Sequence, residues 1–436
     1  MDIGAAIHNS TKVLVVGQGY VGLPLAMAAV DSGYDVVGYD VSVDRVKRLA
    51  DGDSFVEDIT TDVLQAALDS GRYRVTDDRL ACEAFDIAVI TVPTPLRETQ
   101  PDLSYIESAA FDLAPYLTPG AMVVLESTTY PGTTEELLVP LLEAGSGLRA
   151  GSDFAVGYSP ERIDPGNQTW TFATTPKVVS GIDAASLDRI DAFYSSIVDR
   201  TVRVSSTRSA EMAKLLENTF RHVNIALVNE LAMFAADLGI DLWESIDAAS
   251  TKPFGFMRFN PGPGVGGHCL PIDPSYLSWT VRQRLGRSFR FVELANDIND
   301  HMPDYVHARL VRGLNERGLA MSKAQVLVLG LAYKANSSDA RESPALALIE
   351  HLRRDGATVK VCDPHVREDF PSPPFSGPMR SSCAERVELT VEEVCAADAV
   401  VVVTDHAAFD MDMVIANASY VLDTRHRLNG SNVEQL

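Results

Sequence analysis

The chain has 436 residues, of which 46% are hydrophobic, and this length and composition favour about three packed globular domains. Its 37 basic and 60 acidic residues give a net charge of −23, which argues against nucleic acid or an anionic membrane surface as a partner. No signal peptide pattern opens the chain, no apolar run approaches the roughly 18 residues of a membrane span, and five scattered cysteines fit neither disulfides nor zinc, so we expect a cytoplasmic protein without a metal.

The first predicted element is a buried strand over residues 11–16, which leads through a glycine-rich turn into an apolar helix over 23–30. This order of strand, turn and helix is what a dinucleotide-binding fingerprint requires. The next strand, 35–40, ends in Asp40, where a carboxylate can bind a ribose hydroxyl of the adenosine and so favours NAD over NADP. Arg45 either lies over the adenosine or faces water. The alternative to cofactor binding is that the glycine-rich turn serves only to pack the strand against the helix. The predicted cofactor contacts in the turn are Gly17, Gly19, Tyr20, Val21 and Gly22.

Further apolar strands alternate with helical stretches, as in a doubly wound parallel sheet. They cover residues 86–91, 121–125 and 154–158. Each is followed by a polar segment that contains proline: 92–95, 126–132 and 159–165. Ligands bind at the carboxyl ends of such strands, so three polar segments at one edge predict a binding site, although each alone is compatible with a turn.

A long helix is predicted over residues 209–238, which contain neither proline nor glycine, and Gly239 follows as its C-cap. At about 1.5 Å per residue its length is roughly 45 Å, enough to bridge two domains and to offer a surface for dimerisation. Lys214 and Asn218 stand four residues apart and share one face of this helix. A lysine among apolar neighbours is either functional or simply extends its ammonium to water.

Cys269 lies in a segment dense in glycine and proline, residues 261–274. A thiol there can add to an aldehyde and hold it for a second oxidation, whereas the structural alternative is a buried cysteine in a tight loop. We expect His268 to be structural or to contact a sugar, because adjacent residues in an extended loop point opposite ways. His222 and His301 fall on helices, and we expect them to pack or to face solvent.

A second α/β unit begins with a strand over 324–330 and repeats the first pattern without its glycines, so we expect it to bind something other than a dinucleotide. A helix over 344–354 follows, and residues 371–378 are predicted to form a surface loop. The remaining predicted strands are 358–362, 399–404 and 420–423. Three cations follow strand ends, where they can meet phosphates: Lys334, Arg341 and Arg425.

Taken together, these segments resemble the UDP-glucose/GDP-mannose dehydrogenase family over nearly the whole chain. The motifs that carry the resemblance are residues 17–24, 92–95, Ser127-Thr128, 159–161, Lys214 with Asn218, the Cys269 loop, and Lys334 with 338–343. The resemblance implies two Rossmann-like α/β domains joined by a long central helix and a helical middle domain, with boundaries at 1–205, 206–318 and 319–436. It also implies NAD on the first domain, a nucleotide sugar as substrate and a homodimer or higher homo-oligomer.

The same resemblance implies a role for each matching residue. Cys269 would be the nucleophile, Lys214 and Asn218 would stabilise a developing oxyanion, and Glu161 would activate water to hydrolyse a thioester. The other implied residues are Thr128 and Asp273 in the water and base network, Thr94, Thr128 and Arg341 near NAD, and Arg162, Arg258, Asn260, Gly264, Gly266, Lys334 and Arg425 near the nucleotide sugar. The overall reaction would convert an alcohol to a carboxylate through a thiohemiacetal and a thioester, with two NAD reduced.

The cysteine loop reads Gly-His-Cys-Leu-Pro-Ile-Asp-Pro, whereas the UDP-glucose branch of the family typically reads Gly-Gly-Ser-Cys-Phe-Pro-Lys-Asp. The loop is most similar to UDP-N-acetylglucosamine 6-dehydrogenases, with UDP-glucose or dTDP-glucose as the alternative substrate. Pro253 stands where the UDP-glucose branch tends to place an arginine near the sugar, and Arg258 is the candidate substitute. More distant alternatives are a two-electron hydroxy-acid dehydrogenase and a non-enzymatic NAD-binding regulator. Uronate products serve polysaccharide biosynthesis and glycosylated metabolites equally.

Overall fold

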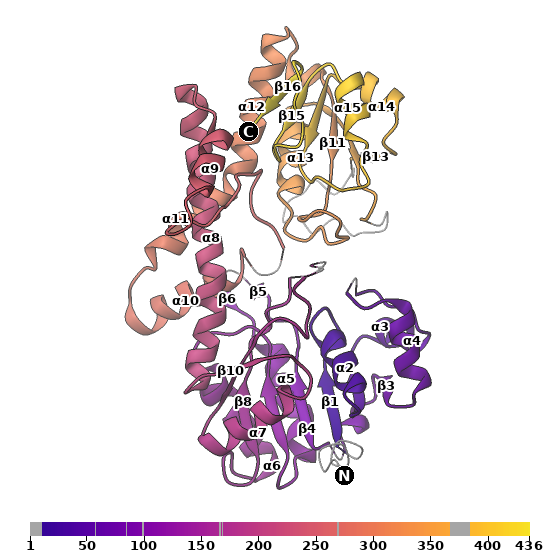
Figure 1. The fold of residues 1–436 in the computed structure, drawn as a ribbon, viewed down its shortest axis with the longest axis vertical. Helices are drawn as coiled ribbons and strands as arrows, with labels where there is room; N and C mark the ends of the chain where they lie inside the picture. The colour runs from indigo at the N-terminus through magenta and orange to yellow at the C-terminus, as the bar shows by residue number, and fades with distance from the viewer. Residues whose placement is uncertain are drawn as a thin grey trace. The chain divides into compact units, whose positions relative to one another are not determined.

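The computed structural model describes residues 11–56, 58–83, 85–97, 100–164, 167, 169–267, 270–366 and 384–436. The chain forms two compact units, residues 1–217 with 283–285 and residues 218–282 with 286–436 (Figure 1). Each unit is built on one large sheet, which confirms the predicted α/β class with two Rossmann-like halves. The predicted division at 205 and 318 stays a prediction. Cys269, His268 and the predicted loop 371–378 lie outside the described residues.

The sheet of the first unit has eight strands in the order β10-β9-β8-β7-β4-β1-β2-β3. Their bounds are β1 (Lys12–Val16), β2 (Asp35–Tyr39), β3 (Tyr73–Thr76), β4 (Ile87–Ile90), β7 (Met122–Leu125), β8 (Ala155–Tyr158), β9 (Lys177–Gly181) and β10 (Thr201–Arg203). All neighbours are parallel except β8 and β9, which follow one another without a crossover helix and pair antiparallel. A two-stranded hairpin, β5 (Leu96–Arg97) with β6 (Gln100–Pro101), lies outside this sheet.

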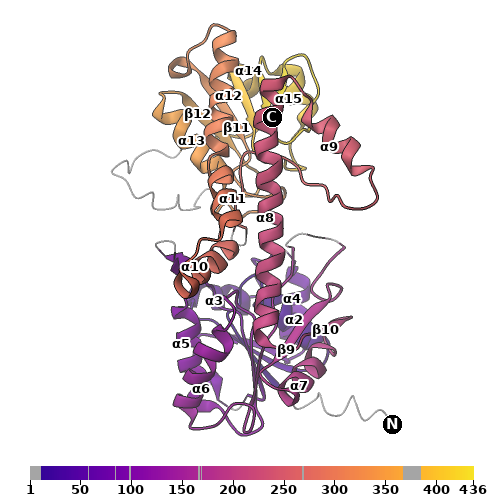
Figure 2. The same cartoon turned by 90° about the vertical axis from the view of Figure 1, so that its left-hand side faces the viewer.

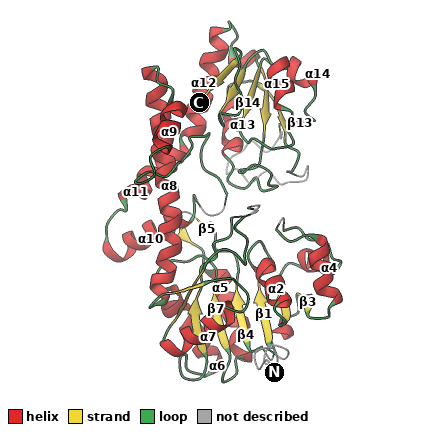
Figure 3. Ribbon diagram, viewed as in Figure 1, coloured by secondary structure: helices red, strands yellow, loops and turns green. Residues whose placement is uncertain are grey.

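Helices cover both faces of the first sheet, as Figure 3 shows. One apolar core packs α2 (Gly22–Asp31), α4 (Thr61–Asp69) and α7 (Ala184–Tyr194) against it. The other core packs α5 (Ser104–Leu113) and α6 (Val139–Ser146) against the opposite face. The smaller elements are α3 (Val43–Ala50), the 3₁₀ turns Arg79–Cys82 and Ala114–Tyr116, and a π-helical turn at Thr134–Leu138. Four strands are apolar almost throughout because both of their faces are buried: β1, β4, β7 and β8.

The second unit holds a six-stranded parallel sheet in the order β13-β12-β11-β14-β15-β16. Its strands are β11 (Gln325–Leu329), β12 (Thr358–Cys362), β13 (Glu385–Arg386), β14 (Ala399–Val402), β15 (Val421–Asp423) and β16 (Val433–Gln435). Side chains of α12 (Met302–Glu316) and α13 (Pro344–Arg354) form the core on one face. Those of α14 (Val391–Ala396) and α15 (Met411–Asn417) form the core on the other face.

The predicted long helix is α8 (Thr207–Leu238), and Figure 2 shows it as one uninterrupted element. The remaining helices are α9 (Leu242–Ser250), α10 (Asp273–Leu285) and α11 (Arg290–Asp300), with a 3₁₀ turn at Met321–Lys323. The pattern of buried and exposed side chains along α8 is the reverse of the pattern in an ordinary surface helix. Polar side chains such as Glu211, His222 and Asn229 are buried, whereas large apolar side chains such as Leu216 and Phe234 are exposed.

The two sheets repeat one local arrangement after their first strands. Gly17 follows β1 with φ +94°, and Gly330 follows β11 with φ +92°, a backbone conformation that favours glycine. The amide of each donates to the carbonyl of the neighbouring strand, that of Gly17 to Tyr39 at 2.8 Å and that of Gly330 to Cys362 at 2.9 Å. The predicted internal repeat is therefore present in the backbone as well as in the sequence.

Candidate functional site

The turn after β1 has the features that a pyrophosphate needs. A Cβ added to Gly22 would overlap the carbonyl of Gly17, so α2 can start this close to the strand only with glycine there. A Cβ on Gly19 would meet nothing within 4 Å, which leaves open space against the backbone. Val21, the N-cap of α2, gives no side-chain cap, and Tyr20 beside it is half-buried. An uncapped helix N-terminus behind an open glycine fits a bound dinucleotide phosphate.

Asp40 lies buried at the end of β2, where the ribose of that dinucleotide is expected. Its Oδ2 accepts the amide of Gln18 at 2.7 Å and forms an ion pair with Arg45 at 2.7 Å. Its Oδ1 accepts the amide of Ser42 at 2.9 Å. Arg45 therefore lies against the carboxylate that would hold the ribose, instead of pointing away into water.

The carboxyl ends of the parallel strands β2, β1, β4, β7 and β8 meet at one edge of the first sheet. The residues that the sequence predicted for the site follow these ends: Asp40 after β2, the glycine turn after β1, Thr94 after β4, Thr128 after β7 and Glu161 after β8. Ser127 Oγ donates to the carbonyl of Val92 at 2.8 Å and joins two of the segments. Thr94 and Thr128 are half-buried, and Glu161 is buried.

Glu161 is held by groups on both sides of its carboxylate. Its Oε1 accepts the amides of Arg162 and Ile163, each at 2.6 Å, and its Oε2 accepts Lys177 Nζ at 3.1 Å. Lys214, on α8, donates its ammonium to the backbone carbonyl of Glu161 at 2.5 Å. The predicted pair of Glu161 and Lys214 is therefore brought together, with two of the three ammonium donors of Lys214 left for other acceptors.

Lys177, which the sequence did not single out, forms the centre of a buried charge cluster. Its Nζ also donates to Glu126 Oε2 at 2.9 Å, and the phenol of Tyr194 donates to the other oxygen of Glu126. We call Glu126, Glu161, Lys177 and Tyr194 the buried cluster. Burial raises the pKa of Glu126 to about 7, whereas Lys177 and Lys214 outweigh burial and hold the pKa of Glu161 below its ordinary value. Burial opposes charge on Lys177, but the two carboxylates keep the pKa of its ammonium raised.

Arg162 turns away from the strand edge. Its guanidinium donates to the carbonyl of Pro176 at 2.6 Å and pairs with Glu217 at 2.8 Å. Within the first unit it ties the loop after β8 to the segment before β9 and to α8. A contact with substrate stays a prediction.

In the second unit, the glycine-rich segment before Cys269 lies directly on the loop after β11. A Cβ on Gly266 would come within 2.6 Å of the carbonyl oxygen of Glu342 and 2.8 Å of Tyr333 Cβ. Gly267 has φ +83°, lies on the ring of Tyr333, and donates its amide to the carbonyl of Arg341 at 3.2 Å. Gly264 has φ +131° and fits against Pro344 and Asn299. These glycines are required because no side chain fits between the two loops.

Asparagine side chains anchor this segment to the helices of the second unit. Asn229 Oδ1 accepts the amide of Gly262 at 2.9 Å, and its Nδ2 donates to Asn299 Oδ1 at 2.9 Å. Asn299 also contacts His222, whose Nε2 lies 2.7 Å from Asn296 Oδ1. Burial lowers the pKa of His222, so its neutral form is favoured. Of the two expectations for His222, packing or facing solvent, the structure shows packing, through hydrogen bonds.

Asn218 and Asp273, both predicted for the site, are joined directly. Asn218 Nδ2 donates to Asp273 Oδ2 at 2.5 Å, and both side chains are buried. Asp273 begins α10, four residues after Cys269 in the sequence. The hydrogen bond therefore joins α8 to the start of α10.

The predicted phosphate-binding cations lie near the carboxyl ends of the second sheet, but they have different partners. Lys334 is half-buried next to Tyr333, whereas Arg341 pairs with Asp339 at 2.6 Å. Arg425 follows β15, donates its Nε to the carbonyl of Val403 at 2.6 Å, and lies against Gly262. Burial lowers the pKa of Arg425 from its ordinary value, which makes a bound anion a favourable neighbour.

Arg258 and Asn260 are exposed and pair with each other. Arg258 Nε donates to Asn260 Oδ1 at 2.9 Å, and its guanidinium contacts Asp247 of α9. Their contact with a sugar stays a prediction.

Asp363 occupies in the second sheet the place that Asp40 occupies in the first, at the end of the second strand. Its Oδ2 accepts the amides of Leu331 and Ala332 and pairs with His406 at 3.0 Å. Its Oδ1 accepts the amides of His365 and Val366, both at 2.9 Å. Burial opposes the charge, but these donors hold the pKa of Asp363 well below its ordinary value. A carboxylate with five donors has no capacity left for a ribose, which explains physically why this sheet does not repeat the dinucleotide site.

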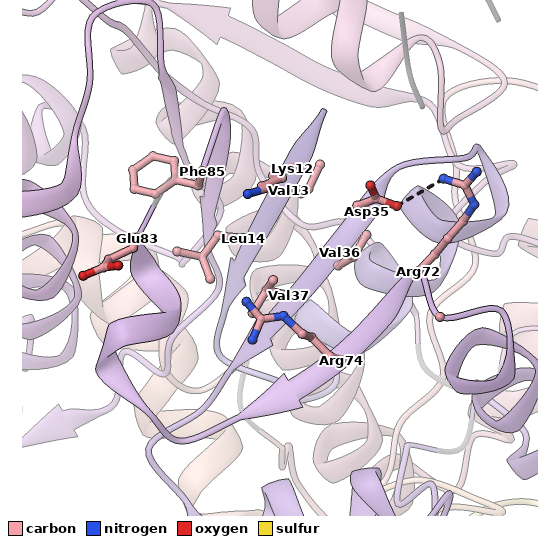
Figure 4. Close-up of a pocket in the computed structure, with 11 residues that line it drawn as sticks. Lys12, Val13, Leu14, Asp35, Val36, Val37, Arg72, Arg74, Glu83 and Phe85 are labelled. Atoms are coloured by element: carbon pink, nitrogen blue, oxygen red, sulfur yellow. Dashed lines mark hydrogen bonds and ion pairs between the residues drawn. The ribbon is translucent and has the colours of Figure 1, made fainter. Parts of the chain in front are cut away.

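A surface cavity of about 120 Å³ lies over the beginnings of β1, β2 and β3 (Figure 4). Lys12, Asp35 and Arg74 line it, and Asp35 pairs with Arg72 at 3.2 Å. These residues belong to the first halves of their strands, whereas the predicted site residues follow the carboxyl ends. Among the described residues there is no cluster of His, Cys, Asp or Glu suited to a metal, and no helix long and apolar enough to cross a bilayer.

Several residues of these networks were missed by sequence reasoning. Lys177 opens a strand whose residues are all buried, so a charge at the end of an apolar strand was the available signal, and Glu126 begins the predicted polar segment 126–132 without having been singled out there. Asp363 could have been found by aligning the second α/β unit with the first, since each places an acid after its second strand. Asn229 and Asn299 carry no sequence signal, because an asparagine inside a helix is usually exposed.

Three protein-family models match successive segments of the chain. All three describe the UDP-glucose/GDP-mannose dehydrogenase family: its NAD binding domain at residues 11–198, its central domain at 208–301 and its UDP binding domain at 327–430. These segments follow the order that the sequence motifs predicted.

Individual relatives are similar over most of their length. The chain is 37% identical to a UDP-N-acetyl-D-mannosamine dehydrogenase of Pyrococcus horikoshii, over 91% of this chain and 90% of the relative. It is 40% identical to a UDP-N-acetyl-D-glucosamine 6-dehydrogenase of Pseudomonas aeruginosa, over 81% of this chain and 83% of the relative. Among solved structures, a UDP-D-ManNAc dehydrogenase from Pyrococcus horikoshii matches with a TM-score of 0.86 at 34% identity, and covers 98% of this chain and 99% of that one.

Proposed function

Because the chain belongs to the UDP-glucose/GDP-mannose dehydrogenase family, and is thus an NAD-dependent nucleotide-sugar dehydrogenase, we propose that it oxidises the C6 hydroxyl of a UDP-N-acetylhexosamine to a carboxylate. UDP-N-acetylglucosamine is the favoured substrate, and its C2 epimer UDP-N-acetylmannosamine is the second candidate. Relatives that bear each of these two names support the acetamido sugar. The cysteine loop, which lacks the pattern of the UDP-glucose branch, supports it independently.

The observation that carries the catalytic proposal is the set of groups at one edge of the first sheet. A glycine turn suited to a pyrophosphate, a buried acid suited to a ribose and Glu161 follow the carboxyl ends of β1, β2 and β8, and Lys214 of α8 contacts the backbone of Glu161. NAD, when bound, accepts a hydride, and Gly19, Gly22 and Asp40 are the residues that would hold it.

Each side chain has a separate task in this proposal. Cys269 adds to the aldehyde level of C6 and carries the acyl group as a thioester. Lys214 and Asn218, one helical turn apart, stabilise the negative charge that develops on the sugar oxygen. Asp273 orients Asn218 through their hydrogen bond. Glu161 takes a proton from the water that hydrolyses the thioester. Lys334 and Arg425 bind the nucleotide end of the substrate.

The test counts NADH formed per sugar consumed, with limiting UDP-N-acetylglucosamine, UDP-N-acetylmannosamine, UDP-glucose and dTDP-glucose in separate assays. We expect about two NADH per molecule of the N-acetylglucosamine nucleotide and slow reaction of the glucose nucleotides, because the thioester retains the sugar through both oxidations. Rapid turnover of UDP-glucose would overturn the substrate assignment. One NADH per sugar in the wild type, or unchanged uronate from Cys269→Ala, would overturn the thioester mechanism.

We further propose that the exposed apolar stripe of α8 is covered by a second copy of the chain. Its side chains lie at helical spacing: Met212, Leu216, Phe220, Leu227, Leu231, Phe234 and Leu238. Leu216 is 63% exposed and Phe234 is 55% exposed, which is costly for large apolar groups arranged in one row. Burying each such side chain contributes about 2 kcal/mol.

The oligomer is tested by light scattering after gel filtration. We expect the wild type to form at least a dimer and the double variant Leu216→Glu/Phe234→Glu to be monomeric. Leu80→Glu, which changes an isolated exposed leucine of the first unit, is the matched control. A monomeric wild type would refute the proposed interface.

A further inference from the structure

The buried cluster gives Glu161 a restricted environment that the proposed hydrolysis alone does not explain. An ionised carboxylate offers about four lone-pair sites. Oε1 of Glu161 uses two of them for backbone amides, and Oε2 uses one for Lys177. Counting the partners from the described residues, one site on Oε2 remains where a water molecule can donate a hydrogen bond. The direction from which Glu161 can accept a proton is set by the ammonium beside it.

Lys177 in turn is fixed from the side opposite Glu161. Glu126 Oε2 accepts its ammonium at 2.9 Å, and the phenol of Tyr194 holds the other oxygen of Glu126. The side chains of Glu126 and Lys177 are at most 4% exposed, whereas that of Glu161 is 10% exposed. Of these three side chains, Glu161 is therefore the one that reaches toward solvent. The rings of Phe172 and Tyr194 lie 5.4 Å from the ammonium and keep water away from it.

The charges of the cluster explain why both carboxylates need this lysine. Two carboxylates that share one site cannot both stay ionised without a cation between them. Lys177 supplies that cation, and Lys214 contacts the backbone of Glu161 from α8. Burial keeps the pKa of Glu126 near 7, so its charge changes near neutral pH and alters how strongly Lys177 is drawn toward Glu161. Tyr194 does not exchange its proton in this range, since burial and Glu126 hold its pKa well above the ordinary value.

We propose that Lys177 is a positioning residue for thioester hydrolysis: anchored by Glu126 and Tyr194, its ammonium keeps Glu161 ionised and leaves one oxygen lone pair to take a proton from the attacking water. This inference rests on the proposed function. In the step concerned, the water oxygen forms a bond to the acyl carbon, and the carbon–sulfur bond breaks with its electron pair on Cys269. One proton of the water passes to Glu161 and later to solvent, and the second passes from the new carboxylic acid to the cysteine thiolate, so the products are a sugar carboxylate and a free thiol.

The decisive variant is Lys177→Met, which removes the charge and keeps the length of the side chain. We expect the steady-state rate to fall about 100-fold, because the loss of an effective general base costs that order of magnitude. Formation of the first NADH should stay near the wild-type rate, so mixing enzyme with excess substrate should give a burst of about two NADH per active site. Intact-mass spectrometry should then find the acyl group on Cys269. Hydroxylamine, which cleaves thioesters without a base, should restore turnover.

Matched variants separate positioning from general damage. Lys177→Arg keeps the charge, and we expect it to recover part of the lost rate. Lys12→Met, at the exposed start of β1 in the same unit, should behave like wild type. Normal circular dichroism and NAD binding would show that Lys177→Met has folded.

Glu126→Gln tests the same network if Lys177→Met does not fold. It removes the carboxyl group whose charge changes near pH 7, so we expect the change in hydrolysis rate that accompanies this ionisation in the wild type to be absent from the variant. A burst that slows together with the steady state, no trapped acyl group and no effect of hydroxylamine would overturn the proposal for Lys177. The same pH profile near neutrality in Glu126→Gln and wild type would also overturn it. Failure of the proposed function is distinguished because the wild type itself would then reduce no NAD with any nucleotide sugar.

Discussion

Asp40 and Asp363 are the same residue type at equivalent places in two sheets, and their neighbours decide what each can bind. Asp363 is surrounded by four backbone amides and His406, and none of these donors can be exchanged for a ligand without disturbing the loops after β11, β12 and β14. Asp40 accepts two backbone amides, and its third partner among the described residues is the partly exposed Arg45. A side chain that reaches water can move aside, so Asp40 keeps capacity for a ribose.

The first prediction concerns this acid. Asp40→Ala should weaken NAD binding by about 10- to 100-fold, since a hydrogen bond to a charged group contributes about 1.5–3 kcal/mol. It should also narrow the preference for NAD over NADP, because the carboxylate that repels a 2′-phosphate is gone. Fluorescence titration of both cofactors measures the two effects. Asp51→Ala, at an exposed acid after α3, is the control, and equal NAD affinity in wild type and Asp40→Ala would refute the assignment.

At the level of single residues, sequence predicts what is local and misses what depends on distant partners. The glycine turn and Asp40 could be predicted because one βαβ segment contains the whole signal. Lys177 could not, because its two carboxylate partners lie 51 and 16 residues away in the chain. A lone lysine at a strand end becomes significant only when the fold has placed acids around it.

At the scale of an element, α8 shows what periodicity establishes. The predicted helix, 209–238, agrees with Thr207–Leu238 to within two residues, because the chain lacks breakers there and ends in glycine. Apolar residues at helical spacing do not form its buried face: Met212, Leu216, Phe220 and Leu227 are exposed, whereas Leu215 is fully buried. Polar side chains such as Glu211 and Asn229 are buried instead, because each binds groups of a segment that packs against the helix.

The second prediction tests that polar face at Asn229. Asn229→Ala removes the acceptor for the amide of Gly262 and the donor to Asn299, and it leaves both groups buried. We expect a loss of about 1–3 kcal/mol in the free energy of unfolding, and a lower kcat because the segment before Cys269 loses its anchor. Urea unfolding and steady-state kinetics measure the two. Asn224→Ala, on the same helix but half-exposed, should have little effect, and equal losses in both variants would argue against a specific anchor.

At the scale of the whole molecule, sequence predicted two doubly wound sheets and the positions of their main strands along the chain, because each buried strand is a short apolar run. It missed β9 and β10, which extend the first sheet, and the antiparallel pairing of β8 with β9. Nothing local marks that pairing, since it depends on a loop between the two strands that returns without a helix. The loops at the carboxyl ends were predicted as a group, but the partners of each cation were not.

The third prediction is the pH dependence of stability that follows from buried acids. Glu211 accepts the amides of Gly132 at 2.5 Å and Thr134 at 2.9 Å, and burial raises its pKa from 4.5 to about 7. Between these two values the folded chain keeps a proton that the unfolded chain has released, so this contribution to stability is present below about pH 4.5 and is lost as the pH rises through 7. The expected loss is on the order of 3 kcal/mol.

Glu211→Gln removes the titration while retaining the size and shape of the side chain, so its stability should rise relative to wild type as the pH goes from 5 to 8. Unfolding of both proteins at several pH values gives this difference directly, free of other groups such as His222 whose lowered pKa acts in the opposite direction. Glu107→Gln, at an exposed position on α5, should show a constant difference from wild type. If the Glu211→Gln difference is also constant, the carboxylate is ionised throughout this range, and its three donors outweigh the cost of burying its charge.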